Sequence, residues 1–237
     1  MPASPPAEPR YAIYFAPPAT SPLWRFGAAV IGYDAETGAT VAPPELRRFD
    51  AERWREITAE PRRYGFHATL KAPFRLAEGR SEDDLDAACA AFAAERTRFA
   101  CAGVELSAIG RFLALKPASP CAALDRLAGA AVKAFDGFRA PMSAAEREKR
   151  LRAPLTARQQ DHLARWGYPY VLEDFRFHMT LTGPLDDAER ALAEAELAEL
   201  FTASGGDGPL IVGGIALYRQ TAGPFRLLAR FDFGAEK

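Results

Sequence analysis

The sequence predicts an α+β fold of two similar lobes around a shared cleft, each lobe built from a strand, a helix and a strand pair. Two observations support this prediction. An eight-residue motif occurs twice, as FHATLKAP at 66–73 and as FHMTLTGP at 177–184, with five identical positions. Each copy is followed by an Ala-rich helical pattern and then by two strand patterns. Duplication of one unit is the simplest explanation, and a pseudo-twofold axis would then relate the lobes.

Composition places the chain among packed globular proteins without a strong charge bias. The 237 residues are 49% hydrophobic, enough for an ordinary core. The 30 basic and 31 acidic residues nearly cancel, so bulk charge gives no reason to expect a polyanion as partner. No run of about 18 apolar residues indicates a membrane span, so no membrane association is expected.

The N-terminal stretch and the cysteines complete the general picture. MPASPPAEPR is Pro-rich and lacks the apolar region of a signal peptide, which predicts a disordered tail over 1–9 and a single domain over 10–237. Cys89, Cys101 and Cys121 are an odd set without metal-ligand spacing. A reducing, cytoplasmic location is expected.

The elements of the first half follow from local patterns. YAIYFAP at 11–17 alternates as a strand until proline stops it. Gly-rich turn signals and later helical spacing predict an irregular segment and then a short helix over 21–63. Ser81 and Asp84 form a capping-box pattern that begins a helix ending near residue 98. Two strands broken near Gly110 should follow.

The second half repeats this order after an intervening helical region. A helix is expected over 121–138, and one or two further helices over the polar stretch 143–169, interrupted by Pro154. Thr156 is the expected N-cap of the last of these. The second motif then forms a strand followed by an Ala/Leu/Glu-rich helix. The chain closes with two strands over 210–233.

Side-chain alternation divides each motif into a polar and an apolar face, since residues two apart on a strand share a face. The apolar faces should pack beneath helices. The polar faces should look into the cleft, and they consist of His67, Thr69 and Lys71 in the first copy and of His178, Thr180 and Thr182 in the second. Such a cleft fits one tetrahedral anion.

This pattern is suited to cleavage of a phosphodiester. The reaction needs a base for the attacking oxygen and an acid for the leaving oxygen, and histidine can serve as either near neutral pH. Thr69 and Thr180 can donate hydrogen bonds to the non-bridging phosphate oxygens. The mechanism requires no metal and no cofactor. Which of His67 and His178 is the base stays open.

The two His-x-Thr motifs resemble those of the 2H (two-histidine) phosphoesterase superfamily, and the similarity covers most of the chain. That resemblance implies a bilobal fold of duplicated antiparallel sheets with outer helices and cleavage of cyclic phosphodiesters. It also implies that His67 and His178 are the catalytic pair and that Thr69 and Thr180 are the phosphate ligands.

More narrowly, YAIYFAP, IGYDAETG, RYGFHATLKAPFRL and FRFHMTLTGPL resemble the bacterial, phosphonate-metabolism-associated branch of that superfamily (DUF1045-like). This branch implies a small phosphorylated metabolite as substrate, such as a cyclic phosphate of ribose. The chain is also longer than RNA-directed members around 20–60 and 140–165, and these insertions would narrow the cleft.

Three further residues are candidate substrate ligands, each with a structural alternative. Tyr14 on the first strand lines the cleft or packs at an edge. Lys71 shares the predicted face of His67, although its counterpart is Thr182. Arg219 is placed near the second lobe's cleft as an anion ligand, or else is a solvated turn arginine. His162 has no partner motif and is expected to be a surface histidine.

The sequence therefore predicts a metal-independent cyclic phosphodiesterase acting on a small metabolite. Two alternatives stay open. The chain is an RNA 2′,3′-cyclic phosphodiesterase, or it is a phosphate-binding module without catalysis. A metal site using both histidines is less favoured, because no Asp, Glu or Cys accompanies them at ligand spacing. The oligomeric state is not predicted.

Overall fold

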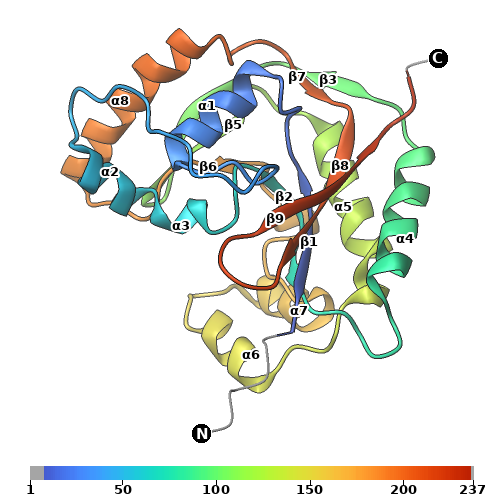
Figure 1. The fold of residues 1–237 in the computed structure, drawn as a ribbon. Helices are drawn as coiled ribbons and strands as arrows, with labels where there is room; N and C mark the ends of the chain where they lie inside the picture. Colours follow the sequence, from blue (N-terminus) through green and yellow to red (C-terminus); the bar gives the residue numbers. More distant parts are fainter. Residues whose placement is uncertain (1–7, 236–237) are drawn as a thin grey trace, which may run out of the picture.

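A computed structural model describes residues 8–235, and its centre is a seven-stranded antiparallel sheet (Figure 1). The strand order is β4-β5-β6-β2-β1-β8-β9, and β3 pairs separately with β7. The predicted α+β class with antiparallel sheets is confirmed. The predicted tail over 1–9 lies outside the described residues except for Glu8 and Pro9.

The strands and helices have the following bounds. The strands are β1 (Arg10–Phe15), β2 (Ala68–Phe74), β3 (Phe99–Cys101), β4 (Val104–Ile109), β5 (Phe112–Pro117), β6 (Met179–Thr180), β7 (Leu210–Val212), β8 (Gly214–Gln220) and β9 (Arg226–Asp232). The α-helices are α1 (Pro22–Ile31), α2 (Ala51–Ile57), α3 (Ala59–Arg62), α4 (Glu82–Ala94), α5 (Ala122–Ala134), α6 (Ala144–Leu151), α7 (Ala157–Trp166) and α8 (Asp187–Ser204). Two 3₁₀ turns are η1 (Asp136–Phe138) and η2 (Leu172–Asp174).

The strands that carry the two motifs pair with each other at the middle of the sheet. Ala68 of β2 lies opposite Met179 of β6 in an antiparallel pair. These residues occupy the same position in the two motif copies. An antiparallel pair between equivalent residues has a local twofold axis at that point. The two motifs therefore meet around such an axis.

The two strand hairpins are exchanged between the halves of the chain. The β4–β5 hairpin, from the first half, extends the sheet beyond the second motif strand, β6. The β8–β9 hairpin, from the second half, extends it beyond β1 on the side of the first motif. The second motif strand thus lies directly beside the first half's hairpin, whereas β1 separates the first motif strand from the second half's hairpin. The sequence order alone does not indicate this arrangement.

Helices cover the sheet and share one hydrophobic core with it. Helix α5 packs on β2, and α4 packs on β8 and β9. Helix α8 contacts β4 and β5, and α1 packs against α8. Figure 1 shows α4 and α5 on one side of the molecule and α1, α2 and α8 on the other. None of the helices in the described ranges is long and apolar enough to cross a bilayer.

The prediction of an irregular segment after residue 21 is wrong, because α1 forms there. Ser21 caps the helix by accepting a hydrogen bond from the Trp24 amide, and Pro22 occupies the first turn. Gly32 ends it in the left-handed conformation, with φ of 71°. Inside the helix, a Cβ on Gly27 would come within 2.1 Å of the Phe66 ring. Glycine at this position therefore lets α1 pack directly on the first motif.

Most other predicted elements are confirmed. Ser81 and Asp84 make both bonds of the capping box at the start of α4. The 143–169 region forms two helices, α6 and α7, and Thr156 caps the second. The β4–β5 turn contains Gly110 with φ of 60°. A disulfide between Cys101 and Cys121, which the sequence did not predict, joins β3 to the start of α5.

Candidate active site

A cavity of about 810 Å³ opens over the paired motif strands. Its lining includes all four predicted motif residues, which are His67, Thr69, His178 and Thr180. The antiparallel register through Ala68 and Met179 sets residue 67 across from residue 180 and residue 69 across from residue 178. Each imidazole therefore lies across the strand pair from the threonine of the other motif.

The two imidazoles are oriented by the same local bond. His67 Nδ1 is 2.8 Å from the Gly65 carbonyl oxygen, and His178 Nδ1 is 2.7 Å from the Arg176 carbonyl oxygen. A carbonyl oxygen only accepts, so each Nδ1 donates and carries the proton. In the neutral rings Nε2 then holds the lone pair. His67 Nε2 is 3.2 Å from Thr69 Oγ1, on the polar side of the strand.

The environment of both rings favours the neutral form. Burial is the main reason that the pKa of His67 falls to about 4, and the nearby His178 lowers it further. The Gly65 carbonyl opposes this shift by accepting from Nδ1. Burial also lowers the pKa of His178, against the Arg176 carbonyl bond. At neutral pH each free imidazole is a base with an available Nε2.

Tyr14 lies against the first imidazole and lines the same cavity. Its ring stacks on His67 with centroids 3.7 Å apart and an angle of 23° between the planes. Tyr14 is fully buried, and its hydroxyl has no hydrogen-bond partner within residues 8–235. Burial raises the pKa of this phenol well above its ordinary value, so it stays a donor.

The prediction that Lys71 shares the face of His67 is wrong. Tyr14 pairs with Thr69 and Ile13 with Lys71, so β2 holds one extra residue, a bulge, between those two positions. The bulge turns Lys71 to the opposite face. Its Nζ donates to the Val132 carbonyl at 3.1 Å and to Asp136 at 2.7 Å, beneath α5.

Arg219 also lies away from the cavity, contrary to prediction. Because β8 joins the sheet beside β1, residue 219 lies on the side of the first motif, and its side chain faces α4. Its Nη1 contacts both oxygens of Glu82 at 3.0 Å. The neighbouring Tyr218 faces the site instead, with its ring centroid 6.3 Å from that of His67.

His162 is not the surface residue that the polar helix indicates. Its exposed fraction is 8%, and its ring nitrogens lie 3.5 Å from Glu173 and Asp174. The 3₁₀ turn η2 covers this side of α7, a long-range packing that the helical pattern does not reveal.

A family model matches most of the chain. The model described as "Protein of unknown function (DUF1045)" matches residues 69–226, about two thirds of the sequence and both motif threonines. The chain belongs to the DUF1045 family. The predicted likeness to DUF1045 is thereby confirmed.

Two curated relatives of this DUF1045 chain carry the same printed name, "Ribose 1,5-bisphosphate phosphokinase PhnN". The relative from Janthinobacterium sp. (strain Marseille) is 38% identical over 232 residues, which are 96% of this chain and 51% of the relative. The relative from Laribacter hongkongensis (strain HLHK9) is 40% identical over 225 residues, 92% of this chain and 50% of the relative. The chain thus spans about half the length of the curated relatives it matches.

Among solved structures, E. coli LigT complexed with 3′-AMP is similar to this DUF1045 chain with a TM-score of 0.41 and 14% sequence identity. The alignment covers 95% of this chain and 99% of LigT.

Several residues of the cavity in this DUF1045 protein were not predicted from its sequence. Arg10 lies on β1, and the region of the predicted 140–165 insertion contributes Arg150 and Arg158. Arg158 is paired with Asp174 at 2.7 and 3.0 Å. Arg10 and Arg150 have no carboxylate partner within residues 8–235. Aromatic rings complete the walls, and they belong to Tyr64, Phe112, Tyr168, Tyr170 and Phe175.

The cavity therefore offers two bases, several hydroxyl donors and unpaired cations in one place. This is a set that suits a phosphate ester. Residues 8–235 contain no group of three His, Cys, Asp or Glu side chains arranged to hold a metal ion. Arg10 lies three residues before Ile13 on the first strand, and no sequence motif at this position identifies it as a site residue.

Proposed function

We propose that this DUF1045 protein hydrolyses a small cyclic phosphodiester by paired histidine catalysis. The pairing of Ala68 with Met179 is the observation that carries the proposal, because it sets two oriented imidazoles and two threonines around one local twofold axis. A phosphate at that axis would have a base on one side and an acid on the other.

We assign His67 as the general base and His178 as the general acid. The pKa of His67 falls to about 4, so its Nε2 is neutral in nearly all free molecules at neutral pH. His178 lacks the stacked tyrosine and is protonated more readily when an anion binds beside it. Its Nε2–H then provides the proton for the leaving oxygen.

The reaction balances with water as the only co-reactant. His67 Nε2 removes a proton from water as the water oxygen bonds to phosphorus, in line with the leaving oxygen. The bond between phosphorus and that ring oxygen breaks, and His178 Nε2–H protonates the oxygen. The product is a phosphomonoester with a free hydroxyl. Exchange with solvent returns His67 to its neutral form, and His178 takes up a proton again when the next substrate anion binds.

The threonines and Tyr14 are placed to stabilise the charge on the phosphate. Thr69 Oγ1 and Thr180 Oγ1 would donate to non-bridging oxygens. Tyr14 would supply a further donor, which has no hydrogen-bond partner among the described residues. Donors already positioned where charge develops contribute to catalysis without reorganisation.

A ribose cyclic phosphate is the substrate class that we favour. The curated relatives are named for ribose 1,5-bisphosphate, and this chain matches only about half of them. No G-x-x-x-x-G-K-[ST] phosphate-binding loop occurs in the 237 residues, so we assign the kinase step of the relatives to their other half. Opening a cyclic ester between the 1- and 2-oxygens of ribose 5-phosphate would form the compound in their name. We therefore propose a role for this chain in phosphonate metabolism.

The substrate class is tested with a panel of cyclic phosphates in excess chelator, containing ribose-based compounds, 2′,3′-cyclic nucleotides and oligonucleotides with a 2′,3′-cyclic end. We expect turnover of the ribose compounds to exceed that of the others. Preferred cleavage of the oligonucleotide would favour an RNA phosphodiesterase. Affinity without turnover would favour a binding module. Loss of activity in chelator would contradict the metal-independent mechanism.

The pH dependence of kcat/KM should be bell-shaped with an acidic maximum. The base must be neutral, so activity falls as pH drops towards 4, the pKa of His67. The acid must be protonated, so activity also falls as pH rises through the pKa of His178, which lies below its ordinary 6.5. The maximum of kcat/KM should therefore lie below pH 6.5. The maximum of kcat should lie at a higher pH, because the bound anion favours the imidazolium form and raises the pKa of His178 in the complex. A flat profile between pH 4 and 9 would exclude the paired roles.

Tyr14→Phe should separate substrate binding from stability. The ring stack on His67 is retained, and the lost hydroxyl has no hydrogen-bond partner within residues 8–235, so the free energy of unfolding should change by less than about 0.5 kcal/mol. The hydrogen bond to a charged phosphate is lost, so kcat/KM should fall roughly tenfold or more. Steady-state kinetics and thermal melts check both parts. Unchanged kcat/KM would remove Tyr14 from the substrate ligands.

A further inference from the structure

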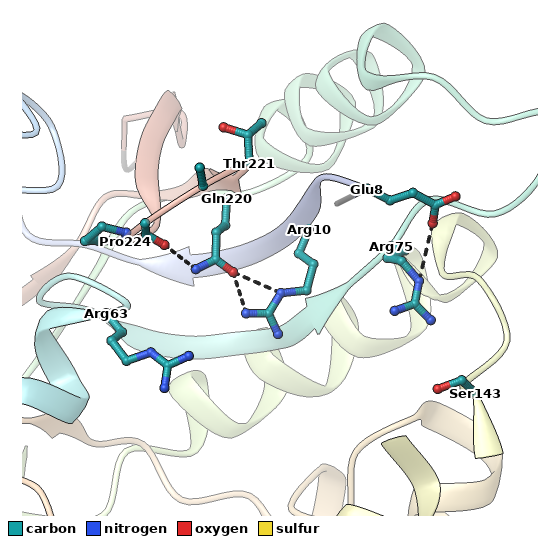
Figure 2. A pocket seen from close by; sticks show the side chains of 10 residues that line it. Glu8, Arg10, Arg63, Arg75, Ser143, Gln220, Thr221 and Pro224 are labelled. Carbon is teal, nitrogen blue, oxygen red and sulfur yellow. Dashed lines mark hydrogen bonds and ion pairs between the residues drawn. The ribbon is translucent and has the colours of Figure 1, made fainter. Parts of the chain in front are cut away.

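A second pocket of about 880 Å³ adjoins the active-site cavity and shares Arg10 with it. Figure 2 shows this pocket between β1, β2 and the β8–β9 turn. Three arginines and the turn after β8 form most of its lining. The full set of lining residues is Glu8, Arg10, Arg63, Arg75, Ser143, Gln220, Thr221, Ala222, Gly223 and Pro224. The described part of this lining contains no aromatic side chain.

The charges of the three arginines are balanced very differently. Arg75 donates two hydrogen bonds to the Glu146 carboxylate, at 2.7 and 2.9 Å, and lies 3.6 Å from Glu8. Arg10 and Arg63 have no carboxylate within ion-pair distance among residues 8–235. The free positive charge of the pocket therefore lies at the end nearest the active site, with Arg10 and Arg63.

Arg10 is held rigidly at the boundary between the two cavities. Its Nε and Nη2 both donate to the Gln220 side-chain oxygen, the first at 3.0 Å, and Gln220 Nε2 donates to the Gly223 carbonyl. The guanidinium also lies over the Phe225 ring, 5.3 Å from its centroid. These contacts fix the orientation of the cation, and its Nη1 has no hydrogen-bond partner among residues 8–235.

Arg63 is attached to the same turn from the other side. Its carbonyl accepts a hydrogen bond of 2.8 Å from the Phe225 amide, just after the turn. Its side chain is exposed, and Figure 2 shows it extending into the same open space as Arg10. Two guanidinium groups thus converge on one space, each with donors that no described protein group uses.

We infer that Arg10 and Arg63 bind a second phosphate, a phosphomonoester carried by the molecule whose cyclic phosphodiester lies between the two histidines. Guanidinium forks match phosphate oxygens, and two unpaired cations match the dianion. A pocket without aromatic lining offers no stacking surface for a base. The inference rests on the proposed function, and it makes the substrate a phosphorylated sugar with both a cyclic and a terminal phosphate.

The test combines turnover with binding. Turnover is measured on ribose 1,2-cyclic phosphate with and without a 5-phosphate, and binding on ribose 1,5-bisphosphate and ribose 1-phosphate by calorimetry. Arg63→Ala should lower kcat/KM for the 5-phosphorylated substrate about tenfold to hundredfold, and weaken binding of the bisphosphate by a similar factor. Its effect on the two ligands without the 5-phosphate should be less than about threefold. The control is Arg126→Ala on the exposed face of α5, outside both cavities.

The possible outcomes distinguish failure of the phosphate subsite from failure of the proposed hydrolase function. Weaker bisphosphate binding in Arg63→Ala without any turnover by the wild type would support the phosphate subsite and contradict the hydrolase. Turnover of both substrates with no difference between Arg63→Ala and Arg126→Ala would support the hydrolase and overturn the subsite. Equal losses on ligands with and without the 5-phosphate would also overturn it, because the arginine would then act as a general cation.

Discussion

Replacing either motif histidine with asparagine should reduce kcat by about 10²–10⁴, the range for loss of a general acid or base. Asparagine retains an N–H close to the position of Nδ1, so the bonds to the Gly65 and Arg176 carbonyls can persist, but it has no equivalent of Nε2. The His67→Asn and His178→Asn proteins should therefore fold normally but have a strongly reduced kcat.

The double variant sharpens this expectation. Groups that act as one catalytic unit give non-additive losses, so His67→Asn/His178→Asn should be hardly slower than the worse single variant. Pre-steady-state and steady-state rates on the best substrate of the panel measure this, with thermal melts to verify folding. If either single variant retains wild-type kcat, the paired mechanism is wrong.

Phe66→Ala should have the opposite effect from the histidine variants. Its free energy of unfolding should fall strongly, whereas its kcat should fall less than theirs. Phe66 is 1% exposed, and its ring packs directly on Gly27 of α1. Truncating such a side chain typically costs about 3–5 kcal/mol. For a chain of this size the melting temperature should fall by roughly 6–20 °C.

The matched comparison is between neighbouring residues of one motif. At a temperature where Phe66→Ala is still folded, its kcat should exceed that of His67→Asn by at least tenfold, whereas its melting temperature should be far lower. Phe66→Leu should recover most of the lost stability, because it refills the space against Gly27. A melting temperature for Phe66→Ala close to that of the wild type would show that the ring is not a packing anchor.

The sequence predicted the elements that local patterns determine. The capping signals at Ser81 and Thr156 and the strand alternation around Gly110 all led to the observed elements. The repeated motif identified four residues that line one cavity. Helix α1 had signals too, in Ser21-Pro22 at its start and Gly32 at its end, but the internal Gly27 made the segment resemble a turn. Gly27 in fact allows the close packing of α1 against the Phe66 ring.

What the sequence could not reveal depends on long-range pairing. The bulge that turns Lys71 away from the site exists only because β2 pairs with β1 in a shifted register. The sequence order predicts Arg219 beside the second motif, but β8 joins the sheet next to β1, on the side of the first motif. Arg10 and Arg63 come together through the β8–β9 turn, more than 150 residues along the chain from both. No local pattern records such contacts.

The most direct test of the central claim is hydrolysis of a ribose cyclic phosphate in H₂¹⁸O with excess chelator, followed by phosphorus NMR. The predicted result is one ¹⁸O on the phosphorus of the monoester for each ring opened, at a rate that the His67→Asn/His178→Asn protein loses. Ring opening that appears only after a divalent metal is added, or label on the sugar in place of the phosphate, would contradict paired histidine hydrolysis.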